Sequence, residues 1–137
     1  MKHWVMLIAF FVAPSVQAGE VRLELHGESI AGHIVRVALY NAPEQFGSEN
    51  QFFKSAIVTA EADSVNVVIS DVPNGKYTVS AYVDVNRNGK QDKNFFGKPT
   101  EAYGFSNNAR GTYGPPDYTE ALFELDGDSV TQSIRLQ

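Results

Sequence analysis

Regular alternation of apolar and polar residues is the sequence feature that most restricts how this chain can fold. In residues 21–26, Val21, Leu23 and Leu25 occupy every second position, and the residues between them are charged. Because successive side chains of a β-strand point to opposite faces, this pattern predicts a strand with one buried face. Similar alternation recurs along the chain and no segment sustains a helical period, so an all-β fold is expected.

Seven short strands are expected, separated by residues typical of turns. The predicted strands are residues 21–26, 33–40, 52–60, 65–70, 76–83, 119–125 and 130–136. The D-V-P-N-G of residues 71–75 predicts a tight turn, and the D-G-D of residues 126–128 is expected to close a terminal hairpin. This arrangement is typical of a single antiparallel β-sandwich of the immunoglobulin-like kind, for which 137 residues suffice.

Residues 84–118 form one long connection between the fifth and sixth predicted strands. Loops longer than about 12–15 residues without secondary structure are usually functional or disordered. The large rings of the first part of this connection belong to Phe95, Phe96, Tyr103 and Phe105. A turn-rich segment with such rings should fold onto itself or onto a neighbouring sheet, so we expect an ordered loop.

The N-terminus has the features of an export signal. Lys2 supplies a positive charge, and residues 5–12 form a continuous apolar run that Pro14 ends. The V-Q-A of residues 16–18 fits a cleavage site, and the run is shorter than the ~20 residues that span a bilayer. We therefore expect residues 1–18 to be a cleaved signal peptide and residues 19–137 to be the domain. The protein would be periplasmic or extracellular, without a permanent membrane anchor.

Charge and cysteine content narrow the function. Removing residues 1–18 takes away Lys2 and no acid, so the net charge of −5 becomes −6. An acidic domain without a basic stripe lacks the charge pattern of a nucleic-acid-binding protein. The chain has no cysteine, which leaves it without disulfides, and small domains of this kind often gain stability from a bound ion.

Residues 84–92 present oxygen-bearing side chains in the order of a calcium loop, with Gly89 at the sharp turn. The predicted Ca²⁺ ligands are the side chains of Asp84, Asn86, Asn88 and Asp92, the main-chain carbonyl of Lys90 and the more distant carboxylate of Glu101. The distant carboxylate is needed because the twelfth position is Phe95 rather than a bidentate glutamate. The alternative is that these residues only form Asx-turns at the end of a hairpin.

Other chemistry has less support. His26 and His33 alternate with apolar residues on predicted strands, and without cysteine they do not make a transition-metal site. Ser106 does not lie in a G-x-S-x-G elbow, so no catalytic residues are predicted.

The aromatic residues of the long connection suggest a further possibility. Tyr103, Phe105, Tyr113 and Tyr118 could form a platform for a glycan or a peptide, or they could pack into a small core of their own. The second arrangement is the commoner one for compact loops.

Two resemblances add to these inferences. The V-P-N-G-K-Y-T-V of residues 72–79 resembles the P-x-G-x-Y turn and strand of transthyretin-like, carboxypeptidase-regulatory-type sandwiches. Residues 84–90, 97–101, 103–108, 115–116 and 121–123 resemble the bacterial family catalogued as domain of unknown function 2141. This resemblance implies a small exported β-sandwich and no established activity.

The sequence therefore predicts an exported, non-enzymatic β-sandwich that binds a ligand, such as a glycan or a protein, or has a structural role. One alternative is a carbohydrate- or peptide-binding module that uses the aromatic loop. Another is a small transthyretin-like hydrolase, but those enzymes use histidines and a C-terminal Tyr-Arg-Gly-Ser, whereas this chain ends in S-I-R-L-Q.

Overall fold

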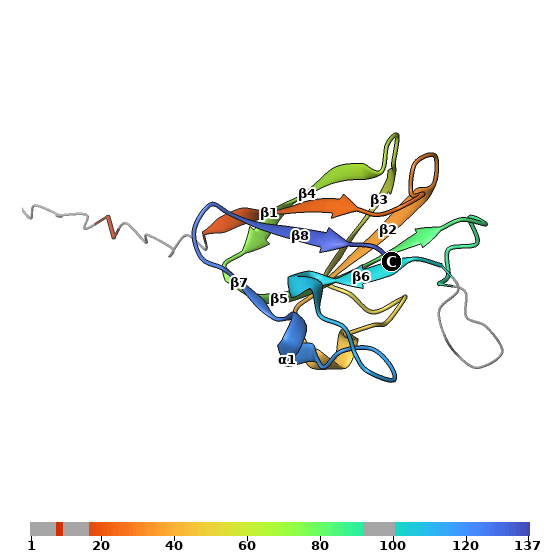
Figure 1. Cartoon of the computed structure of the whole chain (residues 1–137). Helices are drawn as coiled ribbons and strands as arrows, with labels where there is room; N and C mark the ends of the chain where they lie inside the picture. The colour runs from red at the N-terminus through yellow and green to blue at the C-terminus, as the bar shows by residue number, and fades with distance from the viewer. Residues whose placement is uncertain (1–7, 10–16, 92–100) are drawn as a thin grey trace, which may run out of the picture.

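A computed structural model of the chain describes residues 8–9, 17–91 and 101–137. Two β-sheets pack face to face (Figure 1), so the predicted sandwich is confirmed, with eight strands in the described part of the chain instead of about seven. One sheet has the order β4-β1-β8, and the other has the order β3-β2-β5-β6, with β7 also paired to β5. The strands are β1 (Ala18–His26), β2 (Ile34–Tyr40), β3 (Lys54–Thr59), β4 (Ser64–Pro73), β5 (Gly75–Asp84), β6 (Tyr103–Phe105), β7 (Phe123–Leu125) and β8 (Ser129–Arg135).

The core lies between the sheets and follows the predicted alternation. Val21, Leu23 and Leu25 of β1 are buried, and so are Val79 and Ala81 of β5 on the facing sheet. Each fully buried Val or Leu side chain contributes about 1.5–3 kcal/mol through removal of apolar surface from water. The alternation therefore fixes which face of each strand turns inward.

The predicted terminal hairpin is wrong. Tyr118–Ala121 is a short helix, α1, and the strand that follows, β7, pairs with the Gly75–Tyr77 end of β5. The D-G-D turn, with Gly127 at φ +111°, then carries the chain to the other sheet, where β8 pairs with β1 in parallel. Alternation predicts a strand but not its neighbour, so the sequence could not distinguish this crossover from a hairpin.

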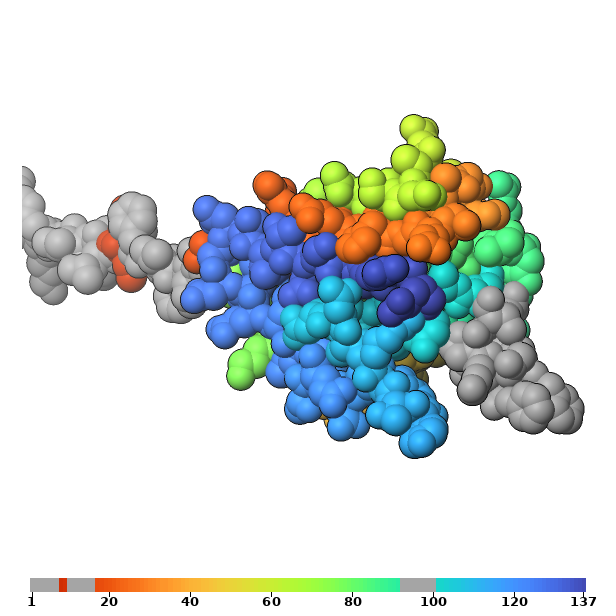
Figure 2. Space-filling model, in the orientation of Figure 1, coloured from red at the N-terminus to blue at the C-terminus, as the bar shows by residue number. Residues whose placement is uncertain are grey.

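The two sheets are joined at one edge, which we call the seam, formed by residues 103–108 and 134–137. The main chains of Tyr103 and Gln137 exchange two hydrogen bonds, of 3.2 Å and 3.1 Å, while the Leu136 amide donates to the His26 carbonyl at 2.7 Å. The end of the chain thus lies between β1 and β6, as the colours of Figure 2 show. At the opposite edge, Lys54 Nζ of β3 donates to the carbonyls of Ser70 and Asp71, at 2.7 Å and 2.9 Å, and links the sheets there.

The long connection is not a loop throughout. It contains β6 and the 3₁₀ turn η2 (Ser106–Asn108), and residues 92–100 lie outside the described part of the chain. Strand β6 pairs with the Ser80–Tyr82 part of β5, and β7 pairs with its start. Between these two, Ser106 Oγ accepts the Val79 amide hydrogen at 2.9 Å and donates to the Ala121 carbonyl at 2.5 Å. A serine side chain therefore fills a gap in the hydrogen bonding along the edge of β5.

This role predicts that Ser106→Ala lowers the free energy of unfolding by about 1–3 kcal/mol, because it leaves a buried amide and a buried carbonyl without that partner. Thr78→Val is the matched control. Thr78 is also fully buried, but its hydroxyl has no hydrogen-bond partner among the described residues. Its removal should leave stability unchanged or raise it. Urea denaturation of the two variants tests this, and equal losses would contradict the role of Ser106.

Candidate metal centre

The loop that follows β5 winds around side-chain oxygens. Arg87 and Gly89 have φ of 57° and 77°, which turns the chain sharply after Asp84. The Asn88 amide lies 3.2 Å from Asp84 Oδ1 and 3.4 Å from Asn86 Oδ1, so these two oxygens converge on one N–H group. Asn88 Oδ1 in turn accepts the Lys90 amide hydrogen at 2.9 Å. Three of the predicted ligand side chains therefore share one hydrogen-bonded turn.

Asp84 is the most constrained of these residues, because its side chain is 0% exposed. Its Oδ2 accepts hydrogen bonds from Arg36 Nε at 2.7 Å and from the Gly89 amide at 2.8 Å. Burial alone raises the pKa of Asp84, but the hydrogen bonds from Arg36, Gly89 and Asn88 outweigh it and hold that pKa below the ordinary 3.8. The carboxylate is therefore ionised and oriented, with Oδ2 more heavily occupied than Oδ1.

Glu101 reaches the same turn from the other side of the connection. Its Oε2 accepts the Val85 amide hydrogen at 2.6 Å, and the residue is 7% exposed. A second carboxylate thus lies beside Val85, the residue that follows Asp84. The sequence analysis expected a distant carboxylate near this loop, and Glu101 lies there. Whether it binds a metal stays a prediction.

Two further charged residues were missed by the sequence analysis. Arg36 comes from β2, and Glu49 comes from the β2–β3 connection, where its Oε1 accepts the Gln91 amide hydrogen at 3.1 Å. They are 48 and 42 residues distant in sequence from their partners, so no local pattern could have identified them.

The pKa of Tyr82 depends on burial and on the charged residues near the loop. Burial is the main cause that raises its pKa to about 12; the charges of Asp84, Glu49 and Glu101 raise it further, and Arg36 lowers it. Three acids and one guanidinium therefore lie close enough to Tyr82 to act on its pKa, so acidic groups outnumber basic ones around this tyrosine.

The donor set fits a hard cation only in part. Carboxylate and amide oxygens are the ligands that Ca²⁺ prefers. Among the described residues, however, no three histidine, cysteine, aspartate or glutamate side chains are grouped closely enough to hold a metal. Asp92, the remaining predicted carboxylate ligand, lies outside the described residues. A complete shell would need Asp92, or water, besides Asp84, Glu101 and the asparagine oxygens.

Two aromatic residues of the connection, Phe105 and Tyr118, pack with Tyr40 and Phe46 in what we call the aromatic cluster. Phe46 is at its centre, with ring centroids 5.8 Å from Tyr40, 5.5 Å from Phe105 and 5.6 Å from Tyr118. It comes from the β2–β3 connection, next to the 3₁₀ turn η1 (Pro43–Gln45), and the sequence analysis did not include it. Of the four rings proposed as a platform, Tyr113 is fully exposed.

The G-F-S-N-N motif of residues 104–108 has a structural explanation. A side chain at Gly104 would collide with the Arg135 carbonyl, so only glycine lets β6 approach β8 this closely. Asn107 adopts a positive φ of 59° and its Nδ2 donates to the carbonyls of Glu120 and Leu122, at 3.2 Å and 2.9 Å. Asn108 Oδ1 accepts the Arg135 amide hydrogen at 2.9 Å. The motif therefore holds the seam and α1 together.

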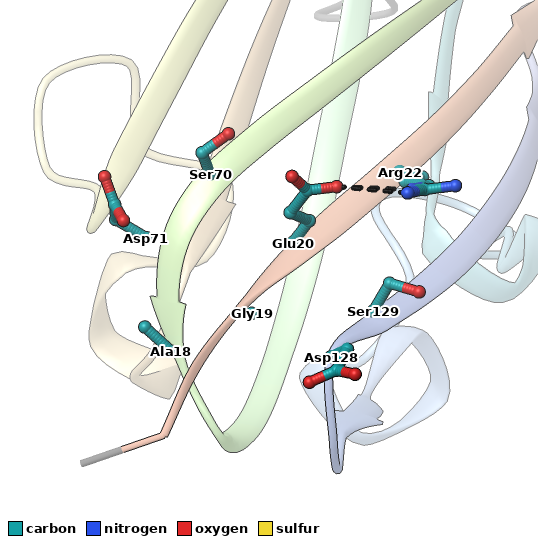
Figure 3. Close-up of a pocket in the computed structure, with 8 residues that line it drawn as sticks. All are labelled: Ala18, Gly19, Glu20, Arg22, Ser70, Asp71, Asp128 and Ser129. Atoms are coloured by element: carbon teal, nitrogen blue, oxygen red, sulfur yellow. Dashed lines mark hydrogen bonds and ion pairs between the residues drawn. The ribbon is translucent and has the colours of Figure 1, made fainter. Parts of the chain in front are cut away.

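A separate hollow of about 360 Å³ lies at the start of β1, where Glu20 and Arg22 form an exposed ion pair of 3.3 Å (Figure 3). The carboxylates of Asp71 and Asp128 also line it. Such an exposed pair contributes little to stability.

No helix in the described part of the chain is long and apolar enough to cross a membrane.

The environment of Asp84 predicts a pH dependence of stability. Since its folded-state pKa is lowered, Asp84 stabilises the protein fully above the unfolded pKa of about 4, and this contribution is lost as the pH falls through the folded-state pKa. Asp84→Asn should therefore cost about 1–3 kcal/mol at pH 7 and progressively less towards pH 3. Asp117→Asn, at an exposed residue, is the control and should cost less than about 0.5 kcal/mol at pH 7. Denaturant melts between pH 3 and pH 7 measure both, and a pH-independent loss in Asp84→Asn would contradict the expectation.

Comparison with known proteins supplies a family. Neither a curated protein nor a solved structure was found to match the chain. Residues 24–133 match the profile of a bacterial family, and this match covers most of the chain, including the D-x-N-x-N-G loop and the G-F-S-N-N motif. The chain therefore belongs to the family described as "Uncharacterized protein conserved in bacteria (DUF2141)".

Proposed function

We propose that this protein is an exported, non-enzymatic β-sandwich that acts as a binding or structural module in the cell envelope or outside the cell, and that calcium stabilises the loop after β5. The observation that carries the calcium proposal is the convergence of Asp84 Oδ1 and Asn86 Oδ1 on one amide, with the Glu101 carboxylate bound to the Val85 amide of the same turn.

The charge balance of the loop supports a cation. Asp84 and Glu101 bring two carboxylates, and Glu49 adds a third nearby through its bond to Gln91. Arg36 offsets one of these charges, but it binds Asp84 Oδ2, which leaves Oδ1 as the oxygen with spare acceptor capacity. A bound calcium ion would supply bonds to hard oxygens and so hold the turn closed.

The lack of a nucleophilic role for Ser106 supports the non-enzymatic part of the proposal. A catalytic serine must meet its substrate and a base, whereas the Ser106 hydroxyl is 0% exposed and donates to the Ala121 carbonyl.

The turn between β4 and β5 crosses from one sheet to the other, and this is compatible with a transthyretin-like arrangement, which we retain as a proposal.

The aromatic loop gives weaker support to a glycan or peptide platform. Stacking on a sugar needs exposed ring faces, and Phe105 and Tyr118 are engaged with Phe46 in the aromatic cluster. Tyr113 is the ring left for such a contact.

Calcium should raise the melting temperature of the unmutated protein. With few charged ligands, a dissociation constant of about 10⁻⁴–10⁻³ M is expected. At a hundredfold excess over that value, an ion that binds only the folded state adds about 2.7 kcal/mol, which corresponds to several degrees in a domain of this size. Asn86→Ala, at an exposed residue, and Glu101→Gln should reduce the shift, and Asn66→Ala on the exposed face of β4 is the control. Thermal melts in millimolar calcium and in chelator measure it. Identical melts of the unmutated protein would mean that the loop is only a set of Asx-turns.

The exported form should begin at or near Gly19. Strand β1 pairs with β4 from Ala18 onward, and an added side chain at Gly19 would lie 2.8 Å from the carbonyls of Gly127 and Asp128. A cleaved chain would thus start near the beginning of the central strand β1, with a residue whose small size is required there. Intact-mass analysis of protein from the periplasm or the medium decides this, and a mass that includes residues 1–18 would contradict export with cleavage.

A further inference from the structure

We propose that a second hollow, on the seam, binds an oxyanion: a carboxylate, sulfate or phosphate group carried by a larger polar molecule. The hollow has a volume of about 280 Å³, and its basic or donor side chains are His26, Asn108, Arg110 and Arg135. We call it the seam hollow. The seam hollow shares no residue with the proposed calcium loop. The proposal rests on the proposed binding function, because it names the chemical group of the partner that this function would require.

The charge of the seam hollow is opposite to that of the chain. The protein carries 16 acidic and 11 basic residues, and none of the side chains that line this hollow is acidic. Two arginines and a histidine come together there from three separate segments, namely β1, β8 and the segment after η2. Because the net charge of −5 repels anions, attraction of an anion here has to be local.

Arg110 is already oriented. Its Nη1 and Nη2 donate to main-chain oxygens of Tyr103 and Gln137, at 3.2 Å and 2.7 Å, and its guanidinium carbon lies 4.4 Å from the centre of the Tyr103 ring. A guanidinium has five N–H donors, so these two bonds leave donors for a ligand. The Tyr103 ring and the two main-chain oxygens therefore fix the Arg110 guanidinium, and several of its N–H donors stay available for a ligand.

Arg135 and His26 are adjacent across the parallel pair of β1 and β8, where they are direct partners in the register. Neither side chain has an ion-pair or hydrogen-bond partner among the described residues. Arg135 is exposed, so its guanidinium can turn to a ligand at little cost in packing. Together with Arg110, these side chains offer an oxyanion charge-assisted hydrogen bonds from the β1–β8 pair and from the segment after η2.

The main chain beneath the hollow is rigid. Tyr103 and Gln137 exchange two hydrogen bonds, Asn108 binds the Arg135 amide, and Gly104 allows close contact with the Arg135 carbonyl. A site built on such a framework does not have to be ordered when the ligand binds, which favours affinity. Its volume is slightly below the range of about 300–1,000 Å³ for drug-sized ligands, so the hollow suits a charged group rather than a whole large ligand.

Amide chemical shifts of ¹⁵N-labelled protein test the site, with sodium sulfate as the first probe and chelator present throughout. Sulfate should shift the amides of residues 104–110 and 135–137 and reach saturation, whereas sodium chloride at equal ionic strength should not. Arg135→Gln should weaken binding about tenfold or more, the size expected for loss of a charge-assisted hydrogen bond. Arg22→Gln, in the middle of β1 and outside the residues that line the hollow, is the matched control and should leave affinity unchanged.

Phosphate and acetate in the same titration distinguish tetrahedral from planar oxyanions, and saturable binding of either supports the site. Shifts that stay linear, match those in chloride, or keep the same affinity in Arg135→Gln would overturn the proposal. Because chelator removes calcium, a negative calcium melt and a negative anion titration are separate results. Unchanged amide positions elsewhere in the spectrum show that Arg135→Gln has folded, so loss of binding cannot be mistaken for loss of structure.

Discussion

The polar main chain of β5 has to find hydrogen-bond partners on both sides, and the other elements are arranged around this requirement. On one side, β2 pairs with Thr78–Asp84. The other is covered in three pieces, because β7 pairs with its start, Ser106 binds Val79 in the middle, and β6 pairs with Ser80–Tyr82. An unpaired buried amide costs about 1–3 kcal/mol, so even a single gap would be expensive in a domain of this size. The G-F-S-N-N motif supplies the side chain that closes that gap.

The last residue of β5 is under a second constraint, which is the burial of a charge. Asp84 ends the strand as a fully buried carboxylate, and removal of a charge from water is unfavourable unless it is paired and hydrogen-bonded. Arg36 and two loop amides provide that compensation, so the turn after β5 is wound by the needs of this one carboxylate. The same winding brings the Asn86 oxygen beside it. The oxygen atoms that stabilise this turn are therefore the same ones that the calcium proposal assigns as ligands, which explains why the sequence alone left both possibilities open.

Sequence reasoning recovered what depends on local periodicity and missed what depends on long-range pairing. The inward positions of Val21, Leu23 and Leu25 follow from alternation and are confirmed, as is the sandwich. The crossover before β8 could not be predicted, because alternation is the same whether a strand pairs with its predecessor or with β1. For the same reason Arg36 and Glu49, which reach the loop from another strand and another connection, had no local signal. The ligand spacing from Asp84 to Lys90 was visible, because a turn is specified by adjacent residues.

The candidate metal loop and the seam belong to one hydrogen-bonded ladder. Glu101 accepts the Val85 amide hydrogen, the Ala102 carbonyl accepts that of Val83, and β6 then continues the pairing through Tyr103. Tyr103 in turn is bonded to Gln137 and carries the Arg110 guanidinium over its ring. A side chain at the start of this ladder therefore helps to fix the backbone at its end. The short strand β6 has only three residues, and a strand so short depends on anchors at both ends, with Glu101 on one side and Ser106 on the other. Loosening of either anchor acts on the main chain that supports both candidate sites.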